Sequence, residues 1–122
     1  SPFCYYYRVI ITKIQPFTKA EIKELSEEYE TYIKTVIDLK RKTCSAGANL
    51  HFENEQILLK SGSNQSDLWA GGIDLEARVI DNNAMINLRP KDNNFSNEIQ
   101  DPNIRKQFEE LMKFFFKLIW TK

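Results

Sequence analysis

The chain has 122 residues, 42% of them hydrophobic and 28% charged, which is ordinary for one globular domain with its own core. Its 17 basic and 17 acidic residues cancel, so we expect neither nucleic acid nor a membrane as a partner. Two cysteines and one histidine supply neither a disulfide framework nor the ligands of a structural zinc site, and we expect no metal and no cofactor. This composition favours a cytoplasmic protein.

We expect a single α+β domain over residues 8–121, preceded by an extension at residues 1–7 that lies outside the fold. The extension, SPFCYYY, lacks the basic flank and apolar core of a signal peptide, and no apolar run approaches the ~20 residues of a membrane span. Whether it is native, processed or an expression remnant stays open, as does pairing of Cys4 with Cys44.

The first elements are expected to be a strand and a long helix. Residues 8–14 (RVIITKI) alternate and are β-branched, which predicts a strand. Thr18 and Glu21 form a capping box that opens a helix predicted to run to about Thr43. Acidic residues fill its early turns and basic residues its end, as the helix dipole favours. Its apolar residues share one face at helical spacing: Ile22, Leu25, Tyr29, Ile33, Val36 and Ile37.

A short second strand is expected next, because Leu50 and Phe52 alternate with polar neighbours. Residues 55–60 are interpreted as a helical turn or two that ends near Gly62. Strand, helix and strand together predict a β-α-β unit, whose two strands would be parallel.

A hairpin is predicted over residues 73–89, where apolar and polar residues alternate on both sides of Asn82-Asn83. Asparagine tolerates the positive φ that a two-residue turn needs. A turn there would pair Val79 with Ile86 on the face toward the helices and Glu76 with Arg89 on the other.

The last helix should begin at Asp101 as N-cap with Pro102 in its first position. Phe114 and Phe116 widen its apolar stripe beyond what one sheet contact requires, while Trp120 falls on its polar side. Two interpretations stay open: a helix wedged between the sheet and the first helix, or a homo-oligomer interface. The stripe itself consists of Ile104, Phe108, Leu111, Met112, Phe115 and Ile119.

The predicted fold is therefore α+β: a small mixed sheet of three to four strands, a β-α-β unit and then a hairpin, with two long helices packed on one face.

Polar and turn-forming residues crowd the segment from Ser61 to Arg105, where we expect any binding site. Arg89 has two interpretations: a cross-strand partner of Glu76, or an anion clamp beside an Asn-rich loop and a helix start. In the clamp, further donors would come from Asn93, Asn94, Ser96 and the amide groups near Asn103 and Ile104. Asp101 at the same helix start competes with an anion.

Other polar residues have equally open roles. His51, the sole histidine, is either a hydrogen-bonded structural residue or a catalytic base. Asp67 and Trp69 either cap a turn and fill the core, or present a carboxylate beside an aromatic wall. Cys44, placed at a helix end, lacks the positive field that activates a thiol. No carboxylates form an acid/base pair of defined spacing, so no catalytic residue is assigned.

Three segments, LHFENE, GSNQSDLW and INLRPKDNNFSNEIQDPNIR, resemble an uncharacterised family of short bacterial and archaeal proteins, a domain of unknown function. That family carries a His-Ala-Asp-like segment, a Gly-Ser-x-Gln-x-Asp-x-Trp-Gly segment and an Ile-Asn-x-Arg-Pro…Asn-x-Ser…Asp-Pro-x-Ile-Arg segment. The resemblance covers residues 9–119 and implies a shared site without naming its chemistry. The matching residues are His51, Gly62, Ser63, Gln65, Asp67, Trp69, Asn87, Arg89, Pro90, Asn94, Ser96, Asp101, Pro102 and Arg105.

This chain departs from the family pattern at Asn49, where a glutamate is expected, and at Phe95, where an arginine is expected. Losing that carboxylate and that guanidinium weakens a catalytic or polyanion-binding role.

The function that we expect first is a small module that binds a small polar or anionic ligand. The alternative is a protein-interaction or homo-oligomeric structural domain that uses its C-terminal helix, and the third is a small hydrolase-type enzyme. The expected ligand-binding residues are His51, Asp67, Trp69, Arg89, Asn94 and Ser96.

Overall fold

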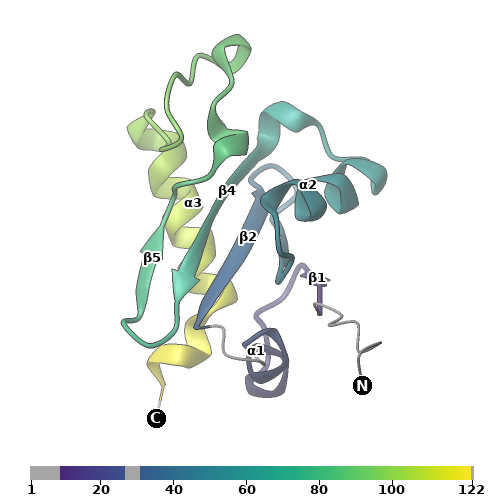
Figure 1. Ribbon diagram of the computed structural model, residues 1–122, viewed down its shortest axis with the longest axis vertical. Coiled ribbons are helices and arrows are strands. Elements are labelled where there is room, and N and C mark those ends of the chain that lie inside the picture. The colour runs from purple at the N-terminus through teal and green to yellow at the C-terminus, as the bar shows by residue number, and fades with distance from the viewer. Residues whose placement is uncertain (1–8, 27–30, 122) are drawn as a thin grey trace, which may run out of the picture.

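The computed structural model describes residues 9–26 and 31–121 (Figure 1). Their strands form one five-stranded sheet in the order β1-β3-β2-β4-β5, and every neighbouring pair is antiparallel. The strands are β1 (Ile11–Lys13), β2 (Tyr32–Asp38), β3 (Thr43–Ala46), β4 (Leu68–Asp74) and β5 (Val79–Asp81), and the α-helices are α1 (Lys19–Leu25), α2 (His51–Lys60) and α3 (Pro102–Phe115).

Helices cover both faces of this sheet rather than the one face that was predicted. In Figure 1, α3 runs behind β4 and β5. The larger core lies on that side, where Phe108 and Met112 of α3 meet Ile33 and Ile37 of β2. A smaller core on the other face joins Leu58 of α2 to the sheet and to the segment that follows β5. The fold therefore has three layers. None of the described helices is both long and apolar enough for a membrane span.

The long first helix predicted from Thr18 to Thr43 is wrong beyond Leu25. Its capping box is confirmed, because Thr18 Oγ1 accepts from the Glu21 amide and Glu21 Oε1 accepts from the Thr18 amide. The second half of the predicted helix instead forms β2 and β3, and residues 27–30, with Tyr29, lie outside the described residues.

The misassignment has a physical cause in the position of β2. This strand pairs with β3 on one side and β4 on the other, and both of its faces are covered. Thr35 to Asp38 are consequently all buried. A central strand of this kind shows a continuous apolar run rather than alternation, and the run here matched a helical face by chance.

The second strand predicted at Leu50 and Phe52 is wrong, and so is the parallel β-α-β unit. Residues 51–60 form α2, which confirms the helical interpretation of residues 55–60. Glu53 starts the helix by accepting a hydrogen bond from the Leu50 amide through its Oε1 atom (3.1 Å). The charged carboxylate at the third helical position was the signal that sequence reasoning overlooked.

The hairpin predicted around Asn82-Asn83 is also wrong. β4 turns into β5 earlier in the chain, through residues 75–78, where Asp74 Oδ1 accepts from the amides of Glu76 and Ala77. An aspartate that binds amides two and three residues on closes a turn by itself. Val79 is 55% exposed, not packed under the helices, and Arg89 is paired with Asp92, not with Glu76.

The last helix begins as predicted, with Asp101 Oδ1 accepting from the amides of Asn103 (2.7 Å) and Ile104 (3.2 Å). Phe116 is buried within the chain, with its ring centroid 4.9 Å from that of Phe17. Phe114 and Trp120 remain 43% and 42% exposed.

Candidate functional site

The segment of residues 82–100 is held to the sheet by Asn87, which is fully buried. Its Nδ2 donates to the Ala70 carbonyl and its Oδ1 accepts from the Ala70 amide, both at 2.9 Å. One side chain thus replaces a strand partner on the part of β4 that β5 does not cover. Nδ2 also contacts the carbonyls of Asn82 (2.9 Å) and Asn97 (3.0 Å).

Asn94 holds the same segment from within. Its Nδ2 lies 2.8 to 2.9 Å from the carbonyl oxygens of Asn87, Ser96 and Glu98, and its Oδ1 accepts from the Gln100 amide. Ser96 Oγ accepts from the Glu98 amide. The side-chain groups of Asn94 and Ser96 that were expected to bind a ligand are therefore engaged with the protein's own backbone.

Asp101 occupies the amides of Asn103 and Ile104 in the same way, so capping takes the groups that the expected anion clamp required.

Arg89 lies in a different environment from these asparagines. Its side chain is 6% exposed, and its guanidinium carbon lies 4.4 Å above the centre of the Trp69 ring. Nε is 2.9 Å from Asp92 Oδ2. Burial lowers the pKa of Arg89, while Asp92 and Glu55 raise it. An arginine still keeps its charge at every physiological pH.

The guanidinium of Arg89 is incompletely paired. Among the described residues, no hydrogen-bond acceptor reaches its terminal nitrogens, Nη1 and Nη2, although both are shielded from solvent. The contact with Asp92 is short enough for an ion pair, but its angle does not make an aligned hydrogen bond. Buried donors are normally satisfied, so these two nitrogens call for an explanation.

Two earlier segments of the chain, α2 and the turn Gln65–Asp67, meet the loop that carries Arg89. Glu55 of α2 is buried, and its negative charge raises the pKa of Arg89. Gln65 Nε2 lies 3.4 Å from Glu55 Oε2. Lys91 Nζ donates to Gln65 Oε1 at 2.8 Å. Of the six residues proposed from sequence, the structure brings Trp69 and Arg89 into contact. Glu55 and Asp92 were missed, because nothing in their local pattern sets them apart from solvated carboxylates.

His51 and Asp67 take other positions. Asp67 is half-buried in the 3₁₀ turn Gln65–Asp67, and its backbone carbonyl accepts from Leu39. His51 begins α2, and its Nε2 lies 2.7 Å from the Gly71 carbonyl. Because a carbonyl only accepts, Nε2 carries the proton of the neutral ring. Burial lowers the pKa of His51, and Lys34 adds to this, while the Gly71 carbonyl and Asp81 act in the opposite direction.

The stability of the fold should therefore depend on pH through His51. Its pKa in the folded chain lies below the ordinary value of 6.5, so the unfolded chain takes up the proton first as the pH falls. The stability that depends on neutral His51 is present above pH 6.5 and is lost as the pH falls through the folded-state pKa.

Because the chain has a single histidine, an NMR titration of its ring proton measures that pKa without ambiguity. Chemical denaturation at pH 7 and pH 5 should show a smaller pH effect in His51→Gln than in the wild type. A histidine pKa at or above 6.5 would contradict this prediction.

Other reactive groups are sequestered. Cys44 lies on β3, not at a helix end, and burial raises the pKa of its thiol, which disfavours the nucleophilic thiolate. The buried carboxylate of Asp38 accepts from the amides of Lys40 and Arg41 and from Ser63 Oγ. Within residues 9–26 and 31–121, no three His, Cys, Asp or Glu side chains form a set that could hold a metal ion.

A family model described as a protein of unknown function (DUF5674) matches residues 9–115 of the chain. No curated protein and no solved structure matches significantly.

Proposed function

The chain belongs to the DUF5674 family, whose function is unknown, and we propose from the chemistry of Arg89 that it is a small binding module for a ligand that carries a carboxylate group. The observation behind this proposal is the buried guanidinium whose terminal nitrogens have no acceptor among the described residues. A ligand oxygen at each nitrogen would complete the hydrogen bonding of this group.

The orientation of the guanidinium favours a planar acceptor. Trp69 covers one face of the group, and Asp92 faces Nε. The edge formed by Nη1 and Nη2 has no acceptor among the described residues, and it is the edge that a ligand would bind. Its two N–H groups point in parallel, which matches the two oxygens of a carboxylate.

The charges around Arg89 favour a monoanion over a dianion. Arg89 and Lys91 contribute two positive charges, and Glu55 and Asp92 contribute two negative ones. A carboxylate adds one negative charge next to the arginine. Phosphate or sulfate would carry a charge of about −2, and the nearby carboxylates of Glu55 and Asp92 would repel it.

The ligand must reach nitrogens that are shielded in this conformation. One exposed hydrogen bond, from Lys91 to Gln65, joins the loop that carries Arg89 to the turn that precedes Trp69. An exposed contact of this kind contributes about 0–1 kcal/mol, so a ligand can displace it at low cost. We infer that entry occurs there.

Thermal denaturation in the presence of simple anions tests the proposal. Acetate at about ten times its dissociation constant should stabilise the protein by about 1.4 kcal/mol, a rise in Tm of about 5 °C, while sulfate at equal ionic strength should do less. Arg89→Lys keeps the charge but loses the paired N–H edge, so its Tm should not respond. Arg41→Lys, at an exposed arginine that donates to the Ser61 carbonyl, is the matched control and should respond like the wild type. An equal acetate response in Arg89→Lys and wild type would contradict the proposal.

A second candidate function, self-association through α3, has one specific observation in its favour. Phe114 of α3 and Ile14, both exposed, are among the residues that line a cleft of about 590 Å³. We expect a second copy of the chain to cover this surface, since exposed apolar side chains that share one hollow favour association.

Sedimentation velocity should then show a dimer in the wild type and a monomer in Phe114→Lys. Lys113→Ala, on the same helix but outside this cleft, serves as the control. A wild-type monomer at high micromolar concentration would exclude this second function.

A further inference from the structure

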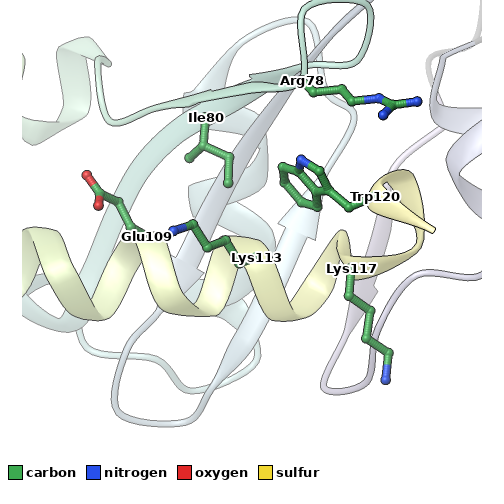
Figure 2. A pocket seen from close by; sticks show the side chains of 6 residues that line it. All are labelled: Arg78, Ile80, Glu109, Lys113, Lys117 and Trp120. Carbon is green, nitrogen blue, oxygen red and sulfur yellow. The ribbon is translucent and has the colours of Figure 1, made fainter.

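A cleft of about 630 Å³ lies between β5 and the C-terminal part of α3, away from Arg89. Figure 2 shows the Trp120 indole between Arg78 on one side and the helix on the other, with Ile80 beside it. The cleft is lined by Arg78, Ile80, Glu109, Lys113, Lys117 and Trp120. Its volume is that of a site for one small molecule.

We propose that this cleft binds a ligand of the mononucleotide class, a planar aromatic ring that carries one phosphate group. The ring would stack on Trp120, and the phosphate would lie among the cationic side chains. The proposal is independent of the ligand at Arg89, because the two sites share no residue.

Trp120 supplies the stacking surface. It ends the 3₁₀ turn Lys117–Trp120 that follows α3, and it is 42% exposed, whereas tryptophan is highly buried on average. The neighbouring Ile80 gives the cleft an apolar wall. An exposed indole beside a hollow of this size suits the π-face of a nucleobase.

The cationic side chains give the cleft a local charge that the whole chain lacks. Three cations and one carboxylate line it, a net charge of +2 in a chain whose net charge is zero. Among the described residues, neither Arg78, Lys113 nor Lys117 makes an ion pair within 4.0 Å. Lys113 lies on α3, Lys117 opens the 3₁₀ turn that follows it, and Arg78 extends from the turn between β4 and β5. Figure 2 shows the charged ends of these three side chains pointing in different directions, so a phosphate in the cleft would require these exposed side chains to turn toward it.

Arg78 also occupies an uncommon backbone position. Its φ is +57°, in the left-handed region where glycine or asparagine is favoured. The folded chain is less stable with arginine than with glycine at this φ. We therefore infer that arginine serves a contact of its side chain and not the turn.

The carboxylate of Glu109 favours a small ligand over a nucleic-acid strand as the occupant of the cleft. Figure 2 shows this carboxylate at the end of the cleft away from Trp120 and Arg78. A strand that continued along the cleft would place further phosphates against it, whereas a mononucleotide has only one phosphate to place. The carboxylate can also accept a hydrogen bond from an exocyclic amine of the ring.

Fluorescence titration of the full chain with AMP, adenosine, inorganic phosphate and hexathymidylate tests the proposal. Trp69 is buried, so quenching by a stacked ring reports on Trp120 and should be absent in Trp120→Phe. AMP should bind at least about tenfold more tightly than phosphate, because stacking of one base contributes about that factor. It should also bind more tightly than adenosine.

Two variants separate a binding role from a structural one. Lys113→Gln should weaken AMP about three- to tenfold, the loss of one charge-assisted contact. Arg78→Gly should weaken AMP similarly while its Tm stays equal or rises, because glycine relieves the positive φ. Lys106→Gln, on an exposed lysine of α3 outside the cleft, is the matched control and should bind AMP like the wild type.

Three results would overturn the proposal: no saturable quenching by AMP up to about 10 mM, equal affinity for AMP and phosphate, or unchanged AMP binding in both Lys113→Gln and Arg78→Gly. Binding of hexathymidylate far more tightly than AMP would overturn the choice of a small ligand and identify a single strand as the occupant.

Discussion

Asn87→Ala should lower the free energy of unfolding by about 3–4 kcal/mol, because it leaves buried backbone groups on two segments without partners. The lost hydrogen bonds join Nδ2 and Oδ1 to both polar groups of Ala70 and to the carbonyls of Asn82 and Asn97. Each unsatisfied buried group costs about 1–3 kcal/mol, although some will find water. The expected result is the release of residues 82–100 from the edge of β4.

Urea denaturation followed by circular dichroism measures this loss. Asn83→Ala is the matched control, since Asn83 is exposed and its side chain makes none of the hydrogen bonds described here. It should change the free energy of unfolding by less than about 0.5 kcal/mol. Similar losses in Asn87→Ala and Asn83→Ala would mean that Asn87 does not hold the segment.

Phe116→Ala should cost about 3–5 kcal/mol, the usual loss for a phenylalanine removed from a closed core. Its ring is fully buried and packs on Phe17, whose amide also binds the Phe115 carbonyl at 2.9 Å. The variant would therefore open a cavity where the end of α3 is attached to the segment before α1.

Phe114→Ala is the control for this second prediction, because Phe114 is next but one in sequence and 43% exposed. It should cost about 1 kcal/mol or less at protein concentrations where the chain is monomeric. A larger loss for Phe114→Ala than for Phe116→Ala would contradict the core described here.

The elements that sequence predicted correctly depend on local chemistry. The capping box of Thr18 and Glu21, and the Asp101-Pro102 start of α3, each need only three or four neighbouring residues. Such signals act within one turn of the chain, so no knowledge of the tertiary structure is required.

The elements that were predicted wrongly from the sequence depend on contacts between residues far apart in the chain. β2 is buried on both faces, and that burial is supplied by α2 and α3, which no local pattern reveals. Asn87 completes the edge of β4 with a side chain, so an alternation rule that pairs strand residues could not find it. The turn at Asp74 was available in the sequence but was outweighed by the more familiar Asn-Asn pair.

For the candidate site, as for the fold, the sequence indicated some of the residues but not the tertiary contacts that they make. The crowding of polar residues singled out Arg89 and Trp69, which lie in contact, but one of the two interpretations of Arg89 paired it with Glu76, whereas its partner is Asp92. Asn94 was chosen for its donors, which the backbone of its own loop occupies. The cleft of Trp120 was missed, because Arg78 and Lys113 come from elements whose proximity depends on the whole fold.

The central claim is that the guanidinium of Arg89 receives a carboxylate, and NMR of its side-chain N–H groups during an acetate titration tests it most directly. The resonance is assigned by its absence in Arg89→Lys. We predict a saturable shift of the Arg89 resonance, while that of the exposed Arg41 changes weakly and linearly with acetate. An Arg89 resonance that stays unchanged, or that follows the linear response of Arg41, would contradict the claim.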